Sequence, residues 1–278
     1  MPDDPRSLLH QNRLEDAIAA QVDVVRTKPG DADARALLAE LLCLAGQFER
    51  ADKQLDLIGT QQPGLAVGVA LFRQLIRGAM AREEVFLKGA VPEMIGGATE
   101  PLQAALSALL DLRDGSEESA SATLKASEAK RPSLSGTCDG KPFDDIRDGD
   151  DVTACLLEVI SSTGKYFWVP WERVAELEFE KPKSLRERIW RQASLAVRDG
   201  SDGIVYIPAL YPLLPGRSLS VEARLGRLTD WIELGGGAMV GVGVRTLLIG
   251  EHGLTLDEIT SLEVDPLPGG AAPEAPAA

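Results

Sequence analysis

The sequence predicts an α+β protein, in which an amino-terminal helical-repeat domain of the tetratricopeptide type precedes a small, mostly antiparallel β-rich domain. In the first half of the chain, bulky and small residues recur every 34 residues, which is the period of tetratricopeptide helix pairs. In the second half, helical spacing gives way to short β-prone runs between glycine-containing turns. We therefore expect a helical domain at 1–133, a β-rich domain at 134–265 and a disordered Pro/Ala tail at 266–278.

The repeat is clearest where residues 12–29 are overlaid on residues 46–63. Both segments carry a bulky residue, a small residue where two helices cross closely, and a proline that ends the second helix: Leu14 and Phe48, Ala17 and Ala51, Pro29 and Pro63. A further copy ends at Pro132, and the intervening unit at 66–91 is degenerate. Because one helix pair cannot bury its apolar stripe alone, we expect residues 5–132 to form about seven or eight helices in a short curved solenoid. An unrelated helical bundle is the alternative.

The change of composition at Leu134 marks the expected domain junction, because the following stretch lacks any helical period. Two β-prone runs at 156–161 and 166–169 flank Ser162-Thr163-Gly164-Lys165, which is the pattern of a β-hairpin. One or two helical turns are expected at 171–177, and further strands at 193–197, 204–207, 242–249 and 262–264. Short strands with glycine-rich turns favour a small antiparallel sheet or a partly open barrel.

The charge balance restricts the class of partner. The 278 residues include 29 Lys and Arg against 43 Asp and Glu, a formal charge of -14, so nucleic acid and anionic membranes are disfavoured. No apolar run approaches the roughly 20 residues that span a bilayer, and the amino terminus lacks a basic region followed by an apolar stretch. Three scattered cysteines suit a reducing compartment. We therefore expect a cytoplasmic protein.

The residues that commonly carry catalysis are sparse. The two histidines, His10 and His252, lie in different expected domains, and neither Gly-x-Ser-x-Gly nor His-Glu-x-x-His occurs. The most metal-like feature is an acidic cluster formed by Asp139, Asp144, Asp145, Asp148, Asp150 and Asp151. Its spacing does not match a calcium loop, so we interpret it as a solvated or partner-facing loop. We expect no catalytic residue, no metal and no cofactor.

Several stretches resemble the ImpE/TagJ family, whose members are accessory proteins of the bacterial type VI secretion system. The stretches are residues 39–43, 51–52, 67–73, 136–145, 157–159, 162–170, 207–211, 226–231 and 241–245. They occur in the order of the family and span about residues 7–265, so the resemblance covers nearly the whole chain except the tail.

The resemblance implies a cytoplasmic, non-enzymatic adaptor of the contractile sheath. It implies an association with the small sheath subunit, and indirectly with the AAA+ ATPase that takes the contracted sheath apart. A helical-repeat solenoid suits this role, because its groove can receive an amphipathic helix from another polypeptide.

Two sets of residues are candidates for binding a partner. By the repeat register, the concave side of the second unit includes Ala36, Glu40, Cys43 and Leu44, although the same residues would also suit packing against the third unit. Phe143, Asp144 and Asp145 form a second candidate surface in a polar loop. Their alternative role is to staple the two domains together, with Phe143 inserted between them.

Two other functions remain open. A general peptide-binding scaffold or co-chaperone would use the same solenoid outside secretion. An enzyme would place its site in the β-rich half, around the acidic cluster and His252, and would require a deep polar pocket with shifted carboxylates.

Overall fold

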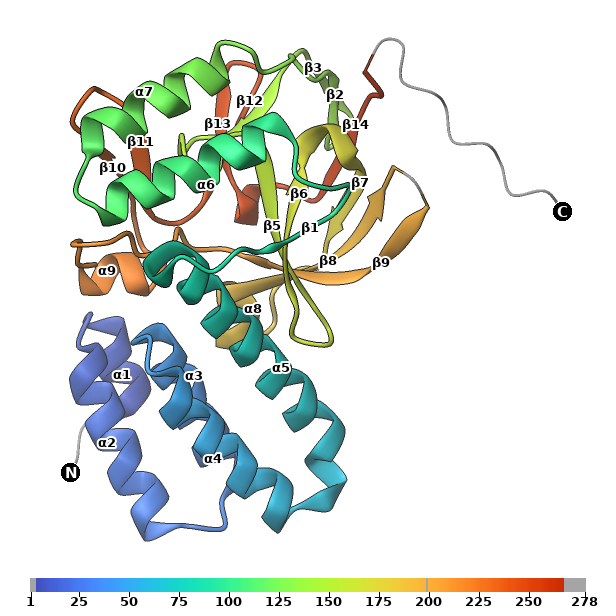
Figure 1. The fold of residues 1–278 in the computed structure, drawn as a ribbon. Coiled ribbons are helices and arrows are strands. Elements are labelled where there is room, and N and C mark those ends of the chain that lie inside the picture. Colours follow the sequence, from blue (N-terminus) through green and yellow to red (C-terminus); the bar gives the residue numbers. More distant parts are fainter. Residues whose placement is uncertain (1–3, 199, 268–278) are drawn as a thin grey trace, which may run out of the picture.

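A helical-repeat region lies beneath a larger β-rich region, and the long helix α5 runs from one into the other (Figure 1). The computed structural model describes residues 4–198 and 200–267. Residues 268–278 of the expected tail therefore lie outside the described residues. Leu267, which the sequence assigned to that tail, packs against the core of the β-rich region.

Five helices form the repeat region: α1 (Pro5–His10), α2 (Leu14–Thr27), α3 (Ala32–Leu44), α4 (Phe48–Gln61) and α5 (Ala66–Glu83). α2 and α4 begin at the bulky repeat positions Leu14 and Phe48, and the small residues of the motif, Ala17 and Ala51, are fully buried. The Asp31 side chain caps α3 by accepting a hydrogen bond from the backbone N–H of Ala34 at 2.9 Å. The repeat thus forms helix pairs as predicted.

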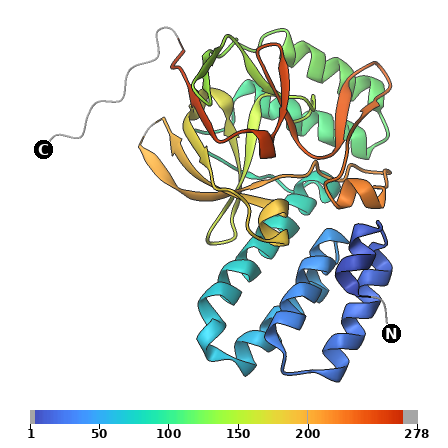
Figure 2. The ribbon, with the colours of Figure 1, turned by 180° about the vertical axis from the view of Figure 1, so that it is seen from behind.

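The next two helices, α6 (Glu100–Arg113) and α7 (Glu117–Glu128), form a hairpin that does not continue the solenoid. They pack against the β-rich region (Figures 1 and 2), where the Ser121 hydroxyl and the Lys125 ammonium donate hydrogen bonds to the carbonyls of Gly235 and Gly236, each at 2.6 Å. The expectation of one solenoid through residue 132 is therefore wrong. The domain boundary at 133/134 stays a prediction.

The segment after α5 explains the diversion of the hairpin. α5 ends in a π-helical turn, η2 (Glu84–Lys88), followed by Gly89 with φ of 83°. The chain then adds strand β1 (Glu93–Met94) to the sheet, parallel to β6. As a result, the far end of the solenoid is uncovered, and Leu57, Leu65 and Val67 are exposed there.

The β-rich region is built on an open nine-stranded sheet with the order β1-β6-β5-β9-β8-β7-β14-β2-β3, in which all pairs except β1–β6 are antiparallel. Its other strands are β2 (Gly136–Cys138), β3 (Lys141–Phe143), β5 (Leu156–Ser161), β6 (Tyr166–Pro170), β7 (Val174–Phe179), β8 (Trp190–Val197), β9 (Ser201–Pro208) and β14 (Ser261–Val264). Two smaller sheets, β10-β11 and β13-β12-β4, comprise β4 (Ile146–Asp148), β10 (Thr229–Glu233), β11 (Met239–Gly243), β12 (Thr246–Ile249) and β13 (His252–Thr255). Two short helices, α8 (Leu185–Ile189) and α9 (Val221–Arg224), lie between strands.

The predicted hairpin is confirmed, because β5 and β6 pair from Leu156↔Pro170 to Ile160↔Tyr166. Two other expectations need correction. The expected helical turns at 171–177 are a single 3-10 turn, η3 (Trp171–Arg173), followed by β7. The expected strand at 242–249 is divided between β11, which ends at Gly243 with φ of 85°, and β12, which begins at Thr246; the Arg245 side chain between them is buried.

One hydrophobic core crosses from the helical region into the sheet. Phe72, Leu75 and Ile76 of α5 share it with Ile160 and Trp168 of the β5–β6 hairpin. α5 can approach β5 because position 78 is glycine: a Cβ there would lie 2.4 Å from Cγ2 of Ile160. Close packing of helix on strand therefore joins the two regions.

The helical stretch Pro63–Lys88 is long and apolar enough, by length and composition alone, to span a membrane. In the structure this stretch joins the solenoid to the sheet. Its residues Phe72 and Ile76 are buried in the shared core, and Arg82 is ion-paired inside the protein. Packing accounts for only part of this apolar character, because 28% of the apolar window is buried.

Replacing Gly78 by alanine should lower the free energy of unfolding by about 1–3 kcal/mol, because the added methyl group overlaps the buried Ile160 side chain. The matched control is Gly68→Ala in the same helix, where nothing lies within 4 Å of the new Cβ. There, the higher helix propensity of alanine should stabilise the protein by about 0.5–1 kcal/mol. Urea denaturation of both variants measures the difference, and an equal gain at both positions would contradict the close approach.

Candidate functional site at the junction of the two regions

A cavity of about 280 Å³ lies where the helical region meets the β-rich region. Its walls come from the end of α3, the start of α4, the end of α5, and the segment that runs from the end of β9 to α9. Most of the lining is apolar and includes Phe48, Phe86, Trp190 and Leu210. Two predicted binding residues, Cys43 and Leu44, line this cavity as buried side chains. Binding pockets are often found at such junctions.

The Glu158 carboxylate forms an ion network beside the cavity. Glu158 lies on β5, and its side chain is completely buried. Arg82 of α5 donates to both of its carboxylate oxygens, with distances of 2.6 Å from Nε to Oε1 and 2.8 Å from Nη2 to Oε2. Arg245, which follows β11 in the β-rich region, donates a hydrogen bond to Oε2. Arg82 also lines the cavity, so the network joins its wall to the core.

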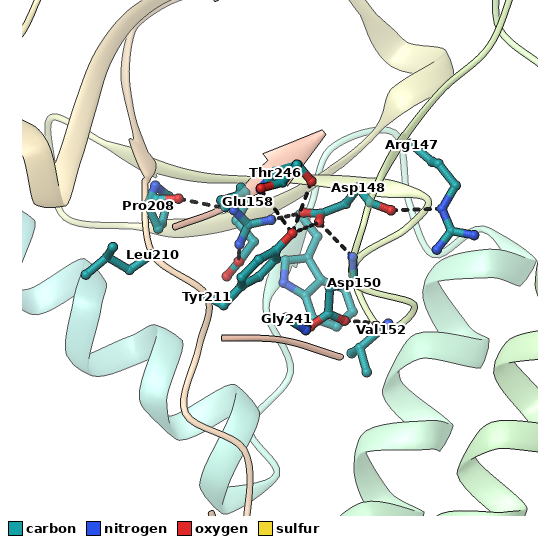
Figure 3. A network of polar contacts seen from close by, with 12 residues as sticks. Arg147, Asp148, Asp150, Val152, Glu158, Pro208, Leu210, Tyr211, Gly241 and Thr246 are labelled. Atoms are coloured by element: carbon teal, nitrogen blue, oxygen red, sulfur yellow. Dashed lines mark hydrogen bonds and ion pairs between the residues drawn. The ribbon is translucent and has the colours of Figure 1, made fainter. Parts of the chain in front are cut away.

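The network continues to Asp148 on β4 (Figure 3). Arg245 donates to the Asp148 carboxylate and, at 3.2 Å, to the Pro208 carbonyl. The Tyr211 hydroxyl donates to Asp148 Oδ1 at 2.8 Å, and it accepts the backbone N–H of Thr246 at 3.0 Å. Two buried carboxylates therefore share one buried guanidinium, and the second arginine, Arg82, balances their charge.

The electrostatics of the site follow from this arrangement. Burial acts to raise the pKa of Glu158, but the charges of Arg82 and Arg245 outweigh it and lower that pKa to about 2. Burial lowers the pKa of Arg245, yet Asp148 and Glu158 raise it above its ordinary value. Both groups are therefore charged at neutral pH, and the network is a set of paired ions.

Asp150 behaves differently from its neighbours. Its buried carboxylate accepts the backbone N–H groups of Val152 at 2.7 Å and Gly241 at 2.8 Å (Figure 3). No guanidinium contacts this carboxylate among the described residues. Burial and the nearby charge of Asp148 raise its pKa from 3.8 to about 7.

The sequence analysis interpreted the acidic cluster as a solvated or partner-facing loop. The structure corrects this for Asp148 and Asp150, which are buried, whereas Asp139 and Asp144 are exposed. Asp145 pairs with Arg131, Asp148 with Arg245 and Asp151 with Arg147, while Asp139 accepts the backbone N–H groups of Thr260 and Ser261. Over residues 4–198 and 200–267, no group of three or more His, Cys, Asp or Glu side chains is arranged to hold a metal ion. Asp145, Asp148 and Asp151 thus have structural partners inside the protein, whereas Asp144 is exposed.

Glu158, Arg245 and Arg82 were not among the candidate site residues of the sequence analysis. The sequence carried a signal for two of them. Glu158 is the only charged residue in the run LLEVI, and Arg245 interrupts an apolar run that continues on both sides. A charge within a buried strand requires a partner of opposite charge. The partner from α5, Arg82, had no such signal.

A second feature, the groove between α1, α3 and α8, contains the other two predicted binding residues of the solenoid. Ala36 and Glu40 line this groove, which has a volume of about 710 Å³, with Leu9, Leu37 and Leu185. Both residues are half-buried. Burial raises the pKa of Glu40, although the Arg186 and Arg6 charges oppose the rise. The four predicted residues are thus divided between a groove and a cavity.

The second predicted surface is also divided. Phe143 and Asp144 line a groove beside β13, and Phe143 packs partly against the core of the β-rich region. The Asp145 carboxylate accepts hydrogen bonds from Arg131 at 2.5 and 2.8 Å, and from the backbone N–H of Leu134 at 3.2 Å. Arg131 lies three residues after the end of α7, so its pair with Asp145 ties the α6–α7 hairpin to the β-rich region, while Phe143 is not inserted between two domains but packs on the β-rich core.

The fold and the site together define a class of protein, in which a tetratricopeptide-type region with a peptide-sized groove is locked to a β-rich region. Residues 8–71 match the family model described as tetratricopeptide repeat, and residues 140–263 match the model described as ImpE protein. A Pseudomonas aeruginosa protein named "Type VI secretion system accessory component TagJ" is 30% identical over 264 residues, covering 93% of this chain and 90% of that protein. The chain belongs to the ImpE/TagJ family.

A solved structure agrees with this assignment. The crystal structure of protein VPA1032 from Vibrio parahaemolyticus is similar, with a TM-score of 0.87 and 28% sequence identity. The match covers 94% of this chain and 97% of that one. The arrangement of helical and β-rich regions is therefore shared with an experimentally determined structure.

Removing one partner from the network should be costly. Arg245→Met should lower the free energy of unfolding by about 3–5 kcal/mol, because Glu158 and Asp148 would stay buried with too little positive charge. The control is Arg26→Met, since Arg26 forms only an exposed pair with Asp23 on α2. That change should alter stability by less than about 0.5 kcal/mol. Similar values for both variants by chemical denaturation would contradict a buried network.

The raised pKa of Asp150 predicts a pH dependence. Between pH 3.8 and about 7, the folded protein holds a proton on Asp150 that the unfolded chain releases. Stability should therefore fall as pH rises through this window, by up to about 1.4 kcal/mol per pH unit from this group. Denaturation of the wild type and of Asp150→Asn at pH 5, 6, 7 and 8 isolates this contribution. Parallel pH profiles for the two proteins would refute it.

Proposed function

We propose that the protein is a cytoplasmic, non-enzymatic accessory protein of the type VI secretion system. In this role it binds the small contractile-sheath subunit and links it to sheath disassembly by the AAA+ ATPase. The single observation that supports this most is the match over 93% of the chain to a protein named as an accessory component of that system.

The groove between α1, α3 and α8 supports binding of a polypeptide segment. Its floor carries Leu9, Ala36 and Leu37, and its rim carries charged side chains of both signs. Apolar positions bordered by charges suit one face of an amphipathic helix. We therefore place the partner in this groove, with Ala36 and Glu40 in the contact. Phe143 and Asp144 remain a second predicted surface.

The internal use of the buried carboxylates supports a non-enzymatic role. Asp148 and Glu158 form ion pairs and hydrogen bonds with Arg245, Tyr211 and Arg82, and their side chains are not exposed to solvent. Asp150 is held by backbone N–H groups. Shifted pKa values at these residues thus have a structural cause and do not require a substrate site.

The second candidate is a general peptide-binding scaffold or co-chaperone outside secretion. The same groove and the tetratricopeptide match support it. The two functions differ in the partner: the scaffold would bind unrelated helical peptides as well as the sheath subunit. Linkage of the gene to secretion-system genes would favour the adaptor.

Blocking the groove tests the proposal. Ala36→Arg places a long side chain in the groove and should weaken binding of the purified small sheath subunit at least about tenfold, equivalent to about 1.4 kcal/mol. Ala122→Arg, on the exposed face of α7, is the control and should bind as the wild type does. Calorimetry measures the affinities, and thermal melting confirms that both variants fold. Wild-type affinity of Ala36→Arg would exclude this groove, and no binding by the wild type would exclude the adaptor role.

A further inference from the structure

The cavity of about 280 Å³ at the junction contains one carboxylate without a counter-ion. Four charged side chains line this cavity, and the three arginines among them pair with carboxylates: Arg82 with Glu158, Arg217 with Glu117, and Arg224 with Glu15 at 3.7 Å. The fourth is Glu83. Among the residues that the structure describes, its carboxylate forms neither an ion pair nor a hydrogen bond.

The surroundings of Glu83 add to this imbalance. Glu83 is the last residue of α5, and its carboxylate lies beside the turn between α3 and α4, where a Cβ on Gly46 would be 3.9 Å from Oε1. Burial and, second, the charge of Glu49 raise the pKa of Glu83. The opposing charges of Lys88 and Arg82 are smaller influences, and both cations have carboxylate partners elsewhere. A cation beside Glu83 would therefore relieve an unfavourable charge.

The rest of the cavity suits the apolar part of a ligand. Phe48, Phe86, Trp190 and Leu213 are among its lining residues. At the roughly 30 Å³ that one water molecule takes up in the liquid, the volume has room for about nine non-hydrogen atoms. Apolar walls with a few polar groups that fix orientation are typical of small-molecule sites.

The sign of the free charge selects the chemistry of the ligand. The paired charges around the cavity cancel one another, which leaves the negative charge of Glu83. An anionic ligand would be repelled by this carboxylate, and a neutral one would bury it further without a partner. A protonated amine would form the missing ion pair, and its bond to a partly buried carboxylate is stronger than one between neutral groups.

We propose that this cavity binds a small organic cation, in which a protonated amine pairs with Glu83 and an aromatic or aliphatic group fills the apolar part. The cavity shares no lining residue with the groove that contains Ala36 and Glu40. The inference therefore goes beyond the proposed function and does not depend on the sheath subunit. Because the cavity walls come from both regions, the bound cation would contact both of them.

The test uses the full chain and the probe 2-phenylethylammonium, which joins a ring to a protonated amine by two carbons. Three matched probes each change one property: 2-phenylethanol has no charge, 3-phenylpropanoate has a negative charge, and ethylammonium has no ring. By calorimetry, 2-phenylethylammonium should bind at least about tenfold more tightly than 2-phenylethanol or ethylammonium, because only it gains both the ion pair and the apolar contact. The carboxylate probe should bind most weakly.

Two variants assign the binding to this cavity. Glu83→Gln should weaken binding of 2-phenylethylammonium about tenfold and leave that of 2-phenylethanol unchanged, because only the charge is removed. Glu176→Gln is the matched control, since Glu176 is an exposed carboxylate on β7 outside the cavity lining, and it should bind every probe as the wild type does. Thermal melting confirms that both variants fold.

The wild type alone is decisive in one respect: equal affinity for 2-phenylethylammonium and 2-phenylethanol, or no binding of either, would overturn the inference. Undiminished binding of the ammonium probe by Glu83→Gln would also overturn it. The same loss in Glu83→Gln and Glu176→Gln would assign the binding to the general negative charge of the chain. None of these measurements includes the sheath subunit, so their outcome leaves the test of the proposed function separate.

Discussion

Burial of the Glu158 carboxylate between two arginines is the constraint on which the rest of the structure depends. Arg82 reaches it from the helical region and Arg245 from the β-rich region. An isolated buried carboxylate would be very unfavourable, and either arginine alone would leave the network, which also includes Asp148, short of positive charge. The two regions must therefore be docked for Glu158 to keep both arginines and for the charge of the network to be balanced. The cavity of about 280 Å³ lies at this junction.

This docking explains why the protein has a groove of limited length. α6 and α7 do not extend the solenoid but cover the β-rich region, where Ser121 and Lys125 bind the Gly235 and Gly236 carbonyls. The concave side is closed at one end by α8 and bordered by α1 and α3. The groove of about 710 Å³ between these elements is the surface to which the proposed partner helix is assigned.

Local patterns predicted the local structure well. The 34-residue spacing located α2 and α4, and the turn at Gly164, with φ of 82°, located the β5–β6 hairpin. The direction taken by α6 and α7 was not predictable, because their apolar faces suit a sheet as well as another helix. The division of Ala36 and Glu40 from Cys43 and Leu44 was not predictable either, because it depends on how distant elements pack against α3. Repeat register gives the face of α3, whereas the position of α8 depends on a long excursion from a distant strand.

The shared network also bears on how such proteins can be recombined. In a typical repeat protein, units can be exchanged or added because each contacts only its neighbours. Here a chimaera that joins the helical half of one relative to the β-rich half of another must keep Arg82 opposite Glu158, and a glycine where α5 meets Ile160. The two halves are therefore expected to change together over evolution, with compensating substitutions concentrated on α5 and β5.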